Sequence, residues 1–143
     1  MIKTPEEFRN RIEKKIDIEF WTTPTNSIEI GQFWRYYEGI NVWNEISKDN
    51  QFKRVCLILN NNLWNGLVLV APITTKHHKH LEKFYVEIND FQNYWLKTPR
   101  IILNQIKMID KKRVSHKTSE NKISFWFVMK VVAKFTNLIL PQQ

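Results

Sequence analysis

Hydrophobic residues recur with two different periods along the chain, and the first of them predicts a helix. Phe8, Ile12 and Ile16 follow one another at intervals of four residues, which places them on one helical face. Thr4 precedes them as a natural N-cap, and Pro5 suits the first helical position. Acidic residues fill the first turn, where a helix favours negative charge. We therefore expect an amphipathic helix that begins at Pro5 and ends near residue 16.

The middle of the chain holds short apolar runs that are rich in β-branched and aromatic residues, the pattern of β-strands. Segments containing Asn, Asp, Gly or Pro separate these runs, and no helical period intervenes. The expected strands comprise residues 32–37, 55–59, 67–73, 84–88, 100–107 and 114–117. Consecutive strands without helices between them favour an antiparallel sheet that curls into a small barrel.

The last predicted element is an apolar helix over residues 120–140, with Ser119 as its N-cap. Its apolar side chains occupy more than one face: Phe125, Trp126, Phe127, Val128, Val131, Val132 and Phe135. Exposed apolar patches of that size are rare on monomers. The helix must therefore pack against the sheet or against another subunit.

Length and composition indicate one folded domain. The chain has 143 residues, of which 43% are hydrophobic. No apolar stretch reaches the length that spans a bilayer, and the charged N-terminus lacks the apolar segment of a secretory signal. The single cysteine, Cys56, lies inside an apolar run, which indicates a buried thiol in a reducing compartment. We expect a cytoplasmic protein without a membrane association.

Basic residues are concentrated beyond the first 30 positions. Residues 1–30 carry 5 Lys and Arg against 6 Asp and Glu; of the 22 basic and 14 acidic residues, 17 and 8 remain for residues 31–143, a balance of +9. Such an excess suits a polyanionic partner, because binding of phosphates releases counterions and long-range attraction steers association. Many basic domains bind no nucleic acid, so charge alone leaves both interpretations open.

The segment KHHKH, residues 76–80, is the one cluster in the sequence that resembles a metal site. Its imidazoles, on His77, His78 and His80, are crowded by lysines, and no carboxylate or thiol with suitable spacing accompanies them. A solvated loop or a phosphate contact is favoured over a metal site. The chain also lacks a Gly-rich phosphate loop, a zinc-spaced Cys pair and a nucleophile elbow, so neither metal nor cofactor is expected.

Aromatic residues offer a second kind of contact for a nucleic acid. Bases stack on exposed aromatic faces with little demand on base sequence. The same side chains also serve as core residues. Both roles stay open for the candidates Tyr36, Tyr37, Trp43, Trp64 and Trp95.

Three segments follow one another in an order that resembles a known family: GQFWRYYEGINVWNEISKDNQFKRVCLIL, NNNLWNGLVLVAPITTK and PRIILNQIKMIDKKRV. In sequence and spacing they resemble the MazF/PemK family of toxin endoribonucleases, and the last segment is the most specific. The matching residues are Gly31, Trp34, Gly39, Asn41, Glu45, Arg54, Pro72, Thr74, Gln105, Ile106, Ile109, Asp110 and Arg113. Four positions depart from the family pattern: Val55 replaces a proline, Trp43 a glycine, Ile46 a glutamine and Lys107 an arginine.

The resemblance covers residues 31–117 and implies a mainly β (α+β) fold. The implied architecture is an SH3-like small antiparallel β-barrel with a C-terminal helix over residues 31–143, preceded by an N-terminal helical extension over residues 1–30. It also implies a homodimer and two further partners, an RNA substrate and a cognate acidic antitoxin protein.

The implied activity is cleavage of single-stranded RNA by attack of a 2′-hydroxyl on the adjacent phosphorus, which needs no metal. Arg54 and Thr74 match the residues most often assigned to this chemistry in the family. A guanidinium offers a fork of donors to a phosphate and stays protonated, so Arg54 is expected to stabilise the transition state. Glu45 is the candidate that orients Arg54. The expected RNA contacts are Lys53, Thr75, Lys76, His77, His78, Lys79, Trp43 and Gln105.

An alternative function belongs to another class. The chain can be a catalytically inactive family member that binds nucleic acid or a partner protein, including a gyrase-directed toxin of the same fold. In that case Arg54 is a strand-edge charge, Thr74 an ordinary strand residue and Glu45 a solvated carboxylate. An Arg54–Thr74 pair in an open groove distinguishes the enzyme from the binding module.

Overall fold

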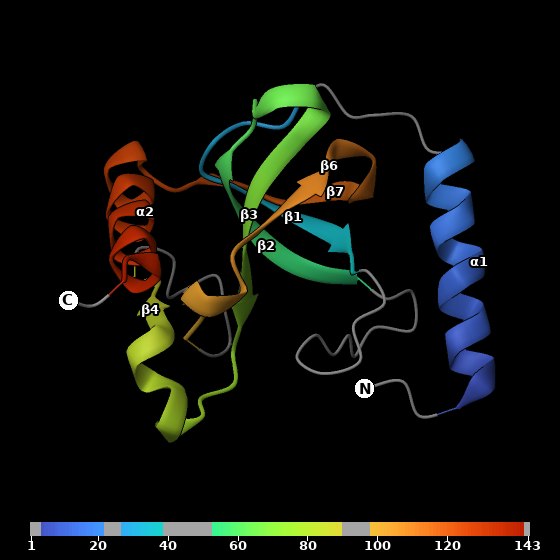
Figure 1. Cartoon of the computed structure of the whole chain (residues 1–143). Coiled ribbons are helices and arrows are strands. Elements are labelled where there is room, and N and C mark those ends of the chain that lie inside the picture. Colours follow the sequence, from blue (N-terminus) through green and yellow to red (C-terminus); the bar gives the residue numbers. More distant parts are fainter. Residues whose placement is uncertain (1–3, 22–26, 39–52, 90–97, 142–143) are drawn as a thin grey trace.

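The computed structural model describes residues 4–21, 27–38, 53–89 and 98–141 (Figure 1). Two helices, α1 (Pro5–Trp21) and α2 (Phe125–Ile139), flank a set of seven strands. The strands are β1 (Gln32–Tyr37), β2 (Lys53–Asn60), β3 (Leu67–Thr74), β4 (Tyr85–Glu87), β5 (Arg100–Ile102), β6 (Lys107–Asp110) and β7 (Val114–Lys122). Among the described helices, none combines the length and apolar character needed to cross a membrane.

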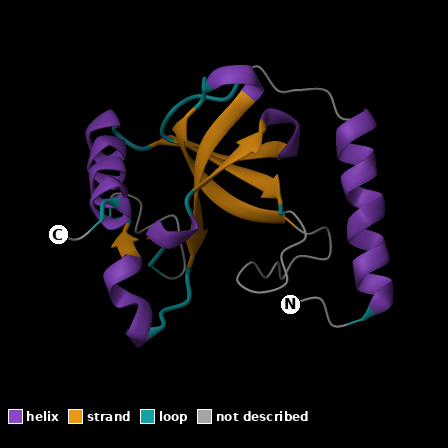
Figure 2. Ribbon diagram, viewed as in Figure 1, coloured by secondary structure: helices purple, strands orange, loops and turns teal. Residues whose placement is uncertain are grey.

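The strands form one antiparallel sheet in the order β4-β5-β3-β2-β1-β7, and β6 pairs with the first half of β3. The sheet twists and curls between the two helices, which lie on opposite sides of it (Figure 2). The expected mainly β class with a helix at each end is confirmed. Within the described residues β4 and β7 are not paired with each other, so closure into an SH3-like barrel stays a prediction.

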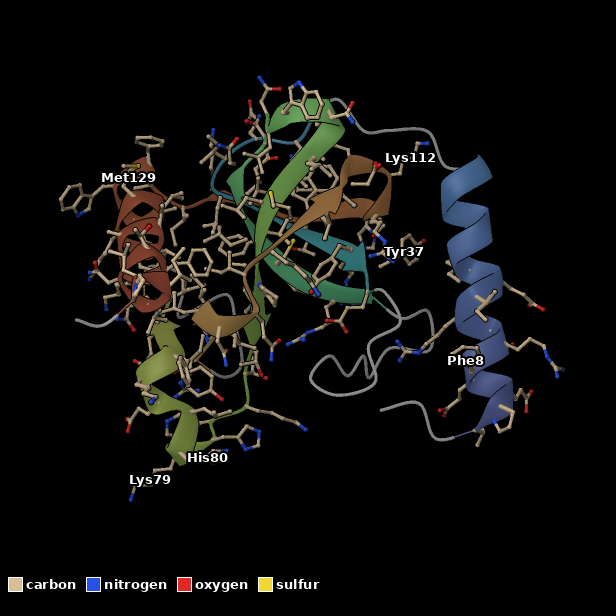
Figure 3. The ribbon with its side chains drawn as sticks, viewed as in Figure 1. Phe8, Tyr37, Lys79, His80, Lys112 and Met129 are labelled. Atoms are coloured by element: carbon tan, nitrogen blue, oxygen red, sulfur yellow. The ribbon has the colours of Figure 1, made fainter. Side chains whose placement is uncertain are left out.

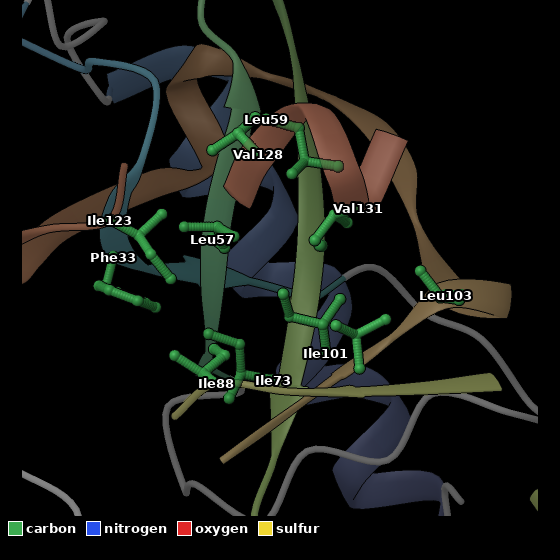
Figure 4. Packing of buried hydrophobic residues seen from close by; sticks show 12 residues of the cluster. Phe33, Leu57, Leu59, Ile73, Ile88, Ile101, Leu103, Ile123, Val128 and Val131 are labelled. Atoms are coloured by element: carbon green, nitrogen blue, oxygen red, sulfur yellow. The ribbon is translucent and has the colours of Figure 1, made fainter. Parts of the chain in front are cut away.

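Two apolar cores lie on the two faces of the sheet, because successive side chains of a strand point to opposite faces. The first core packs under α2 (Figure 4) and contains Phe33, Leu57, Leu59, Ala71, Ile73, Val86, Ile88, Ile101, Leu103, Ile123, Val128 and Val131. The second core contains Ile28, Trp34, Tyr36, Cys56, Ile58, Val68, Val70, Ile109 and Val114. Strand β2 contributes to both cores, which explains why its sequence is apolar without alternation.

Helix α1 begins where the sequence predicts. The backbone N–H of Glu7 donates to Thr4 Oγ1 over 3.1 Å, so Thr4 is the N-cap. The helix continues to Trp21, beyond the expected end near residue 16. Figure 3 shows Tyr37 and Lys112 on the side of the sheet that faces α1. The Lys14 ammonium lies 4.6 Å from the centre of the Tyr37 ring, a cation–π contact between α1 and β1.

The start of helix α2 corrects the prediction. Ser124, and not Ser119, caps this helix, because Ser124 Oγ accepts a hydrogen bond from the Phe127 N–H over 3.2 Å. Residues up to Lys122 belong to β7 and pair with β1, with Gln32 opposite Lys122. The expected helical start at residue 120 is wrong because pairing across the sheet outweighs the local capping signal.

The predicted strand over residues 100–107 is also wrong as a single element. It is divided into β5 and β6 by a 3₁₀ turn, Leu103–Gln105. Both strands pair with the same edge of β3, β5 with its end and β6 with its beginning. The turn buries Leu103 in the first core and directs Gln105 towards β2.

Candidate functional site

Arg54 stands near the start of β2, opposite Tyr36 of β1. The side chains of an antiparallel pair share a face, and Cys56 and Ile58, further along β2, lie in the second core. Arg54 therefore lies on the same face of β2 as these second-core residues, next to Cys56 and nearer the start of the strand. The Tyr36 ring is fully buried there, and the Arg54 side chain is 16% exposed. This partial burial reduces the screening of the charge by water.

A buried carboxylate, that of Glu38, holds the Arg54 side chain. Glu38 follows β1 two positions after Tyr36, and its side chain is 0% exposed. Its Oε1 atom accepts from Arg54 Nη1 over 3.1 Å and from the Tyr36 hydroxyl over 3.2 Å. Lys107 Nζ lies 3.8 Å from the same oxygen. Two cations and a phenol thus converge on one carboxylate oxygen.

Gln105 supplies a second acceptor for Arg54. Its Oε1 accepts from Nη1 over 3.1 Å, the same nitrogen that donates to Glu38. A guanidinium Nη atom carries two hydrogens, so these two bonds occupy Nη1 completely. Among the described residues no hydrogen bond or ion pair is formed by the edge of Nε and Nη2. That edge has the paired donors that bind a phosphate with two parallel hydrogen bonds.

Thr74 ends β3, the strand next to β2. The register sets Cys56 opposite Pro72, so Arg54 and Thr74 both lie two residues further towards the same end of the strand pair. Thr74 Oγ1 accepts from the Lys76 N–H over 3.1 Å. This bond uses a lone pair of the hydroxyl and leaves its O–H able to donate. Arg100 of β5 stands opposite Thr74 on the other edge of β3.

The basic loop begins directly after Thr74. Its residues Thr75, Lys76, His77, His78, Lys79 and His80 are all exposed. Figure 3 shows Lys79 and His80 at the tip of this segment, away from the sheet. His77 Nε2 lies 3.9 Å from Glu82 Oε1. In the part of the chain that the structure describes, no three His, Cys, Asp or Glu residues are grouped as metal ligands would be.

The predicted site residues are thus brought together in part. Arg54 and Gln105 are in contact. Thr74 lies at the end of the neighbouring strand β3, at the same level as Arg54 in the register. Lys53 pairs with Tyr37 through its backbone. Trp43 and Glu45 lie outside the described residues, as does Trp95. The predicted orienting role of Glu45 therefore stays a prediction.

The aromatic candidates divide by burial. Tyr36 is fully buried, and its expected alternative role in core packing is the one the structure supports. Trp64 is 86% exposed in a turn before β3, where a flat ring is accessible to a base. Tyr37 is half-buried beneath Lys14.

The sequence interpretation missed Glu38 and Lys107 as neighbours of Arg54. One signal for Glu38 was available, since alternation along a strand places it on the same face as Tyr36. The pairing of Tyr36 with Arg54 was not available, because a register between strands cannot be read from either strand alone. The position of Lys107 beside Glu38 could not be predicted either, because it depends on the 3₁₀ turn that separates β5 from β6.

Cys56 lies between this polar cluster and the interior of the second core. Its thiol is fully buried, which confirms the expected burial. Burial raises the pKa of the Cys56 thiol, and the effect outweighs a backbone hydrogen bond at Trp34 and the positive charge of Lys107, which both lower it. The thiol is therefore protonated and inert at neutral pH.

The chain was compared with known proteins. No curated protein sequence matches it significantly. One solved structure, described as "Endoribonuclease in complex with its cognate antitoxin from Mycobacterial species", has 15% sequence identity and a TM-score of 0.49, over 83% of this chain and 100% of that chain. The family model of PemK-like, MazF-like toxins of type II toxin–antitoxin systems matches residues 40–135, more than half of the chain, including Arg54, Thr74 and Gln105. The chain therefore belongs to the PemK-like, MazF-like toxin family.

Proposed function

We propose that this protein is the toxin of a toxin–antitoxin pair and cleaves single-stranded RNA without a metal ion. Family membership supports the toxin role. One observation carries the enzymatic part: Glu38 and Gln105 occupy both hydrogens of Arg54 Nη1. The guanidinium is thereby fixed, and its Nε–Nη2 edge is directed to a ligand. A fixed pair of donors is what a phosphate in a transition state requires.

The proposed reaction is an internal transfer at phosphorus. The ribose 2′-oxygen attacks the adjacent phosphorus, and the bond from phosphorus to the 5′-oxygen of the next nucleotide breaks. The 2′-hydroxyl loses its proton and the leaving 5′-oxygen gains one, so the products are a 2′,3′-cyclic phosphate and a 5′-hydroxyl. Negative charge on the non-bridging oxygens is stabilised by Arg54, which needs no reorganisation when the charge develops.

Thr74 and the basic loop complete the proposed site. The Thr74 hydroxyl donates to a second phosphate oxygen, since its interaction with the Lys76 N–H engages it as an acceptor. The exposed residues of the loop, Lys76, His77, His78 and Lys79, contact neighbouring phosphates, and Thr75 lies between them and Thr74. These contacts supply affinity, whereas Arg54 and Thr74 supply rate.

An acidic antitoxin is the proposed protein partner. The balance of +9 over residues 31–143 attracts an acidic segment by the same electrostatics that attract RNA. A segment that is disordered before binding covers a large surface at the cost of ordering entropy. We propose that it binds the same surface as RNA.

The second proposed partner is another copy of the chain. Large apolar side chains remain exposed along α2: Phe125, Trp126, Met129, Leu138 and Ile139. The side of α2 that packs on the sheet uses Val128 and Val131. With 3.6 residues per turn, Phe125, Trp126 and Met129 form a separate outward surface, whereas Leu138 and Ile139 continue the packed side at the end of the helix. A self-complementary pairing about a two-fold axis would cover it. Light scattering at high micromolar concentration should give the mass of a dimer, and a monomer there would remove this proposal.

Mapping the ends of cleaved RNA tests the function. Purified protein is incubated with mixed RNA in excess chelator, and the fragments are labelled with polynucleotide kinase without prior phosphatase. Labelling succeeds if the new ends are 5′-hydroxyls, as the proposed reaction requires. Arg54→Ala should strongly reduce the amount of fragments formed in a fixed time, and Arg9→Ala, which removes an exposed arginine from α1, should not. Binding of RNA without any fragment would favour the binding-module alternative.

A further inference from the structure

We propose that Glu38 is a positioning residue that fixes Arg54 and Lys107 beside the reacting phosphate. The inference rests on the proposed function, because it assigns a role within the same site. Glu38 lies before residue 40, where the match to the toxin family begins, so family membership does not assign it. Its role follows from contacts at one buried oxygen.

The two oxygens of Glu38 have different surroundings. Oε1 receives Arg54 Nη1, the Tyr36 hydroxyl and, at 3.8 Å, Lys107 Nζ. Oε2 is buried and has no hydrogen-bond partner in the described part of the chain. An unpaired buried carboxylate oxygen costs free energy. The two hydrogen bonds and the ion pair at Oε1 offset part of that cost, so the buried carboxylate is retained beside two cations.

Glu38 also keeps two like charges close together. Arg54 Nη1 and Lys107 Nζ both lie within 4 Å of the same oxygen, and their charges would repel each other without the carboxylate between them. With Glu38 ionised, the three groups retain one net positive charge. That charge is available to a phosphate through the Nε–Nη2 edge of Arg54.

Burial distinguishes positioning from direct catalysis. The Glu38 side chain is 0% exposed, so neither oxygen reaches a substrate from this position. Arg54 and Lys107 are 16% and 23% exposed, so both are more accessible to a substrate than the carboxylate is. Glu38 therefore acts through Arg54, and its removal should affect the chemical step without removing a contact to RNA.

Three variants test the role. Glu38→Gln keeps the shape and an acceptor oxygen but removes the charge. Glu38→Asp keeps the charge, but its side chain is shorter by one methylene group, so the carboxylate lies further from Arg54 Nη1. Glu29→Gln is the control, since Glu29 forms an exposed ion pair with Lys122 at 3.4 Å, away from this cluster. Thermal unfolding identifies which variants are folded before any rate is compared.

Single-turnover cleavage should separate positioning from stability. Each Glu38 variant should cleave at least about tenfold more slowly with an RNA Kd within threefold of the wild type, since the lost stabilisation arises in the transition state. In the Arg54→Ala background the same changes should reduce the cleavage rate little further, because Glu38 acts through the residue already removed. Losses that multiply in the double variants, or unchanged rates in the single variants, would overturn the proposal.

Nuclear magnetic resonance provides a measurement that does not depend on cleavage. The Nη hydrogens of Arg54 should give slowly exchanging, resolved signals in the wild type and in Glu29→Gln. They should exchange with water in Glu38→Gln or Glu38→Asp. If the wild type does not cleave RNA, the proposed function fails, and these spectra still decide whether Glu38 fixes Arg54. Identical Arg54 signals in all proteins would overturn the positioning role.

Discussion

At the scale of single residues, Arg54 has two parts with different tasks. Its Nη1 atom is held by Glu38 and Gln105, and its Nε–Nη2 edge is the part that we propose binds the phosphate. A charged side chain that is already immobilised loses little entropy when a phosphate binds. In the proposed reaction the same immobilisation would stabilise the transition state, because donors that are already oriented need not reorganise.

The first prediction concerns Arg54 and Thr74. Arg54→Ala and Thr74→Ala should each slow cleavage by about a hundred- to a thousandfold, the effect of losing one oriented donor. Because both act on one phosphate, the double variant should fall short of the product of the two losses. Single-turnover rates on a mapped site provide the measurement.

Binding and a distant threonine provide the controls for this prediction. RNA affinity should stay nearly constant in both variants, since scattered basic residues supply it. Thr136→Ala removes a hydroxyl from the exposed side of α2 and should cleave at the rate of the wild type. Cleavage at full rate by Arg54→Ala would move the activity elsewhere and favour a binding module.

A second prediction concerns Cys56, whose thiol pKa is raised by burial above its ordinary value of 9.0. Below that pH both the folded and the unfolded chain keep the proton, and the thiol does not affect the pH dependence of stability. Above it the unfolded chain loses the proton and the folded chain keeps it. The folded state then binds more protons, so stability falls as pH rises.

Chemical unfolding between pH 7 and 11 measures this effect. The free energy of unfolding of the wild type should fall more steeply above pH 9 than that of Cys56→Ala, by up to about 1.4 kcal/mol per pH unit. Below pH 9 the two curves should run parallel. Equal slopes above pH 9 would show that the thiol ionises as easily in the folded protein as in the unfolded chain.

At the scale of elements, β3 organises the site. It pairs with β2 along one edge and with β5 and β6 along the other. Its end carries Thr74, and its two partners on the far edge are joined by the turn that presents Gln105. A strand paired on both edges is held against bending, so residues at its end keep their positions.

The connection into β1 yields the third prediction. Gly31 has φ +90°, and its carbonyl accepts from the Ile123 N–H over 2.9 Å, which joins β1 to the chain that leads into α2. A Cβ atom there would lie 2.5 Å from the Ile123 carbonyl oxygen. Gly31→Ala should therefore lose the hydrogen bond as well as strain the backbone.

Gly66→Ala is the matched control, because Gly66 has φ +78° but no atom within 4 Å of an added Cβ. It should lose about 1–2 kcal/mol of stability from the left-handed backbone alone. Gly31→Ala should lose clearly more in the same denaturant titration. Equal losses would mean that the contact with Ile123 relaxes without cost.

At the scale of the whole molecule, charge and apolar surface are separated. The basic excess lies in residues 31–143; the exposed loop after Thr74 carries two lysines and three histidines, and Lys111–Arg113 is a second basic run. Most of the exposed large apolar side chains in the described residues lie on α2 and its C-cap, whereas Phe8, Ile12, Trp64 and Met108 are exposed elsewhere. A basic surface attracts polyanions over a distance of about 10 Å at moderate salt, whereas an apolar surface acts only in contact. The two surfaces therefore suit different partners.

The fourth prediction is competition between RNA and an acidic peptide of the antitoxin type. Fluorescence anisotropy should show the peptide displacing labelled RNA, and less effectively as salt rises from about 50 to about 200 mM. A peptide with the same sequence but Gln and Asn in place of Glu and Asp should displace little. Simultaneous binding of the acidic peptide and RNA would contradict the proposal that both bind the same surface.

Local signals in the sequence determined most of the elements. The cap at Thr4, the strand at 32–37 and the apolar runs of β2 and β3 each depend on neighbouring residues, and the structure confirms them. Arg54 and Thr74 were found through the order of motifs, and the family match includes both. The sequence predicted Gln105 as an RNA contact, which stays a prediction, and the structure shows that its side chain accepts a hydrogen bond from Arg54.

Only the tertiary structure decided what surrounds Arg54. Glu38 comes from one segment, and Gln105 and Lys107 come from another; they meet beside Arg54 because β1 pairs with β2 and a turn interrupts the strand after Ile102. Pairing across a sheet depends on distant residues, so no local pattern reveals it. The same cause misplaced the start of α2, since β1 holds residues up to Lys122 in a strand although Ser119 is a suitable cap. Local sequence sets which conformations are favourable, and contacts between distant segments select among them.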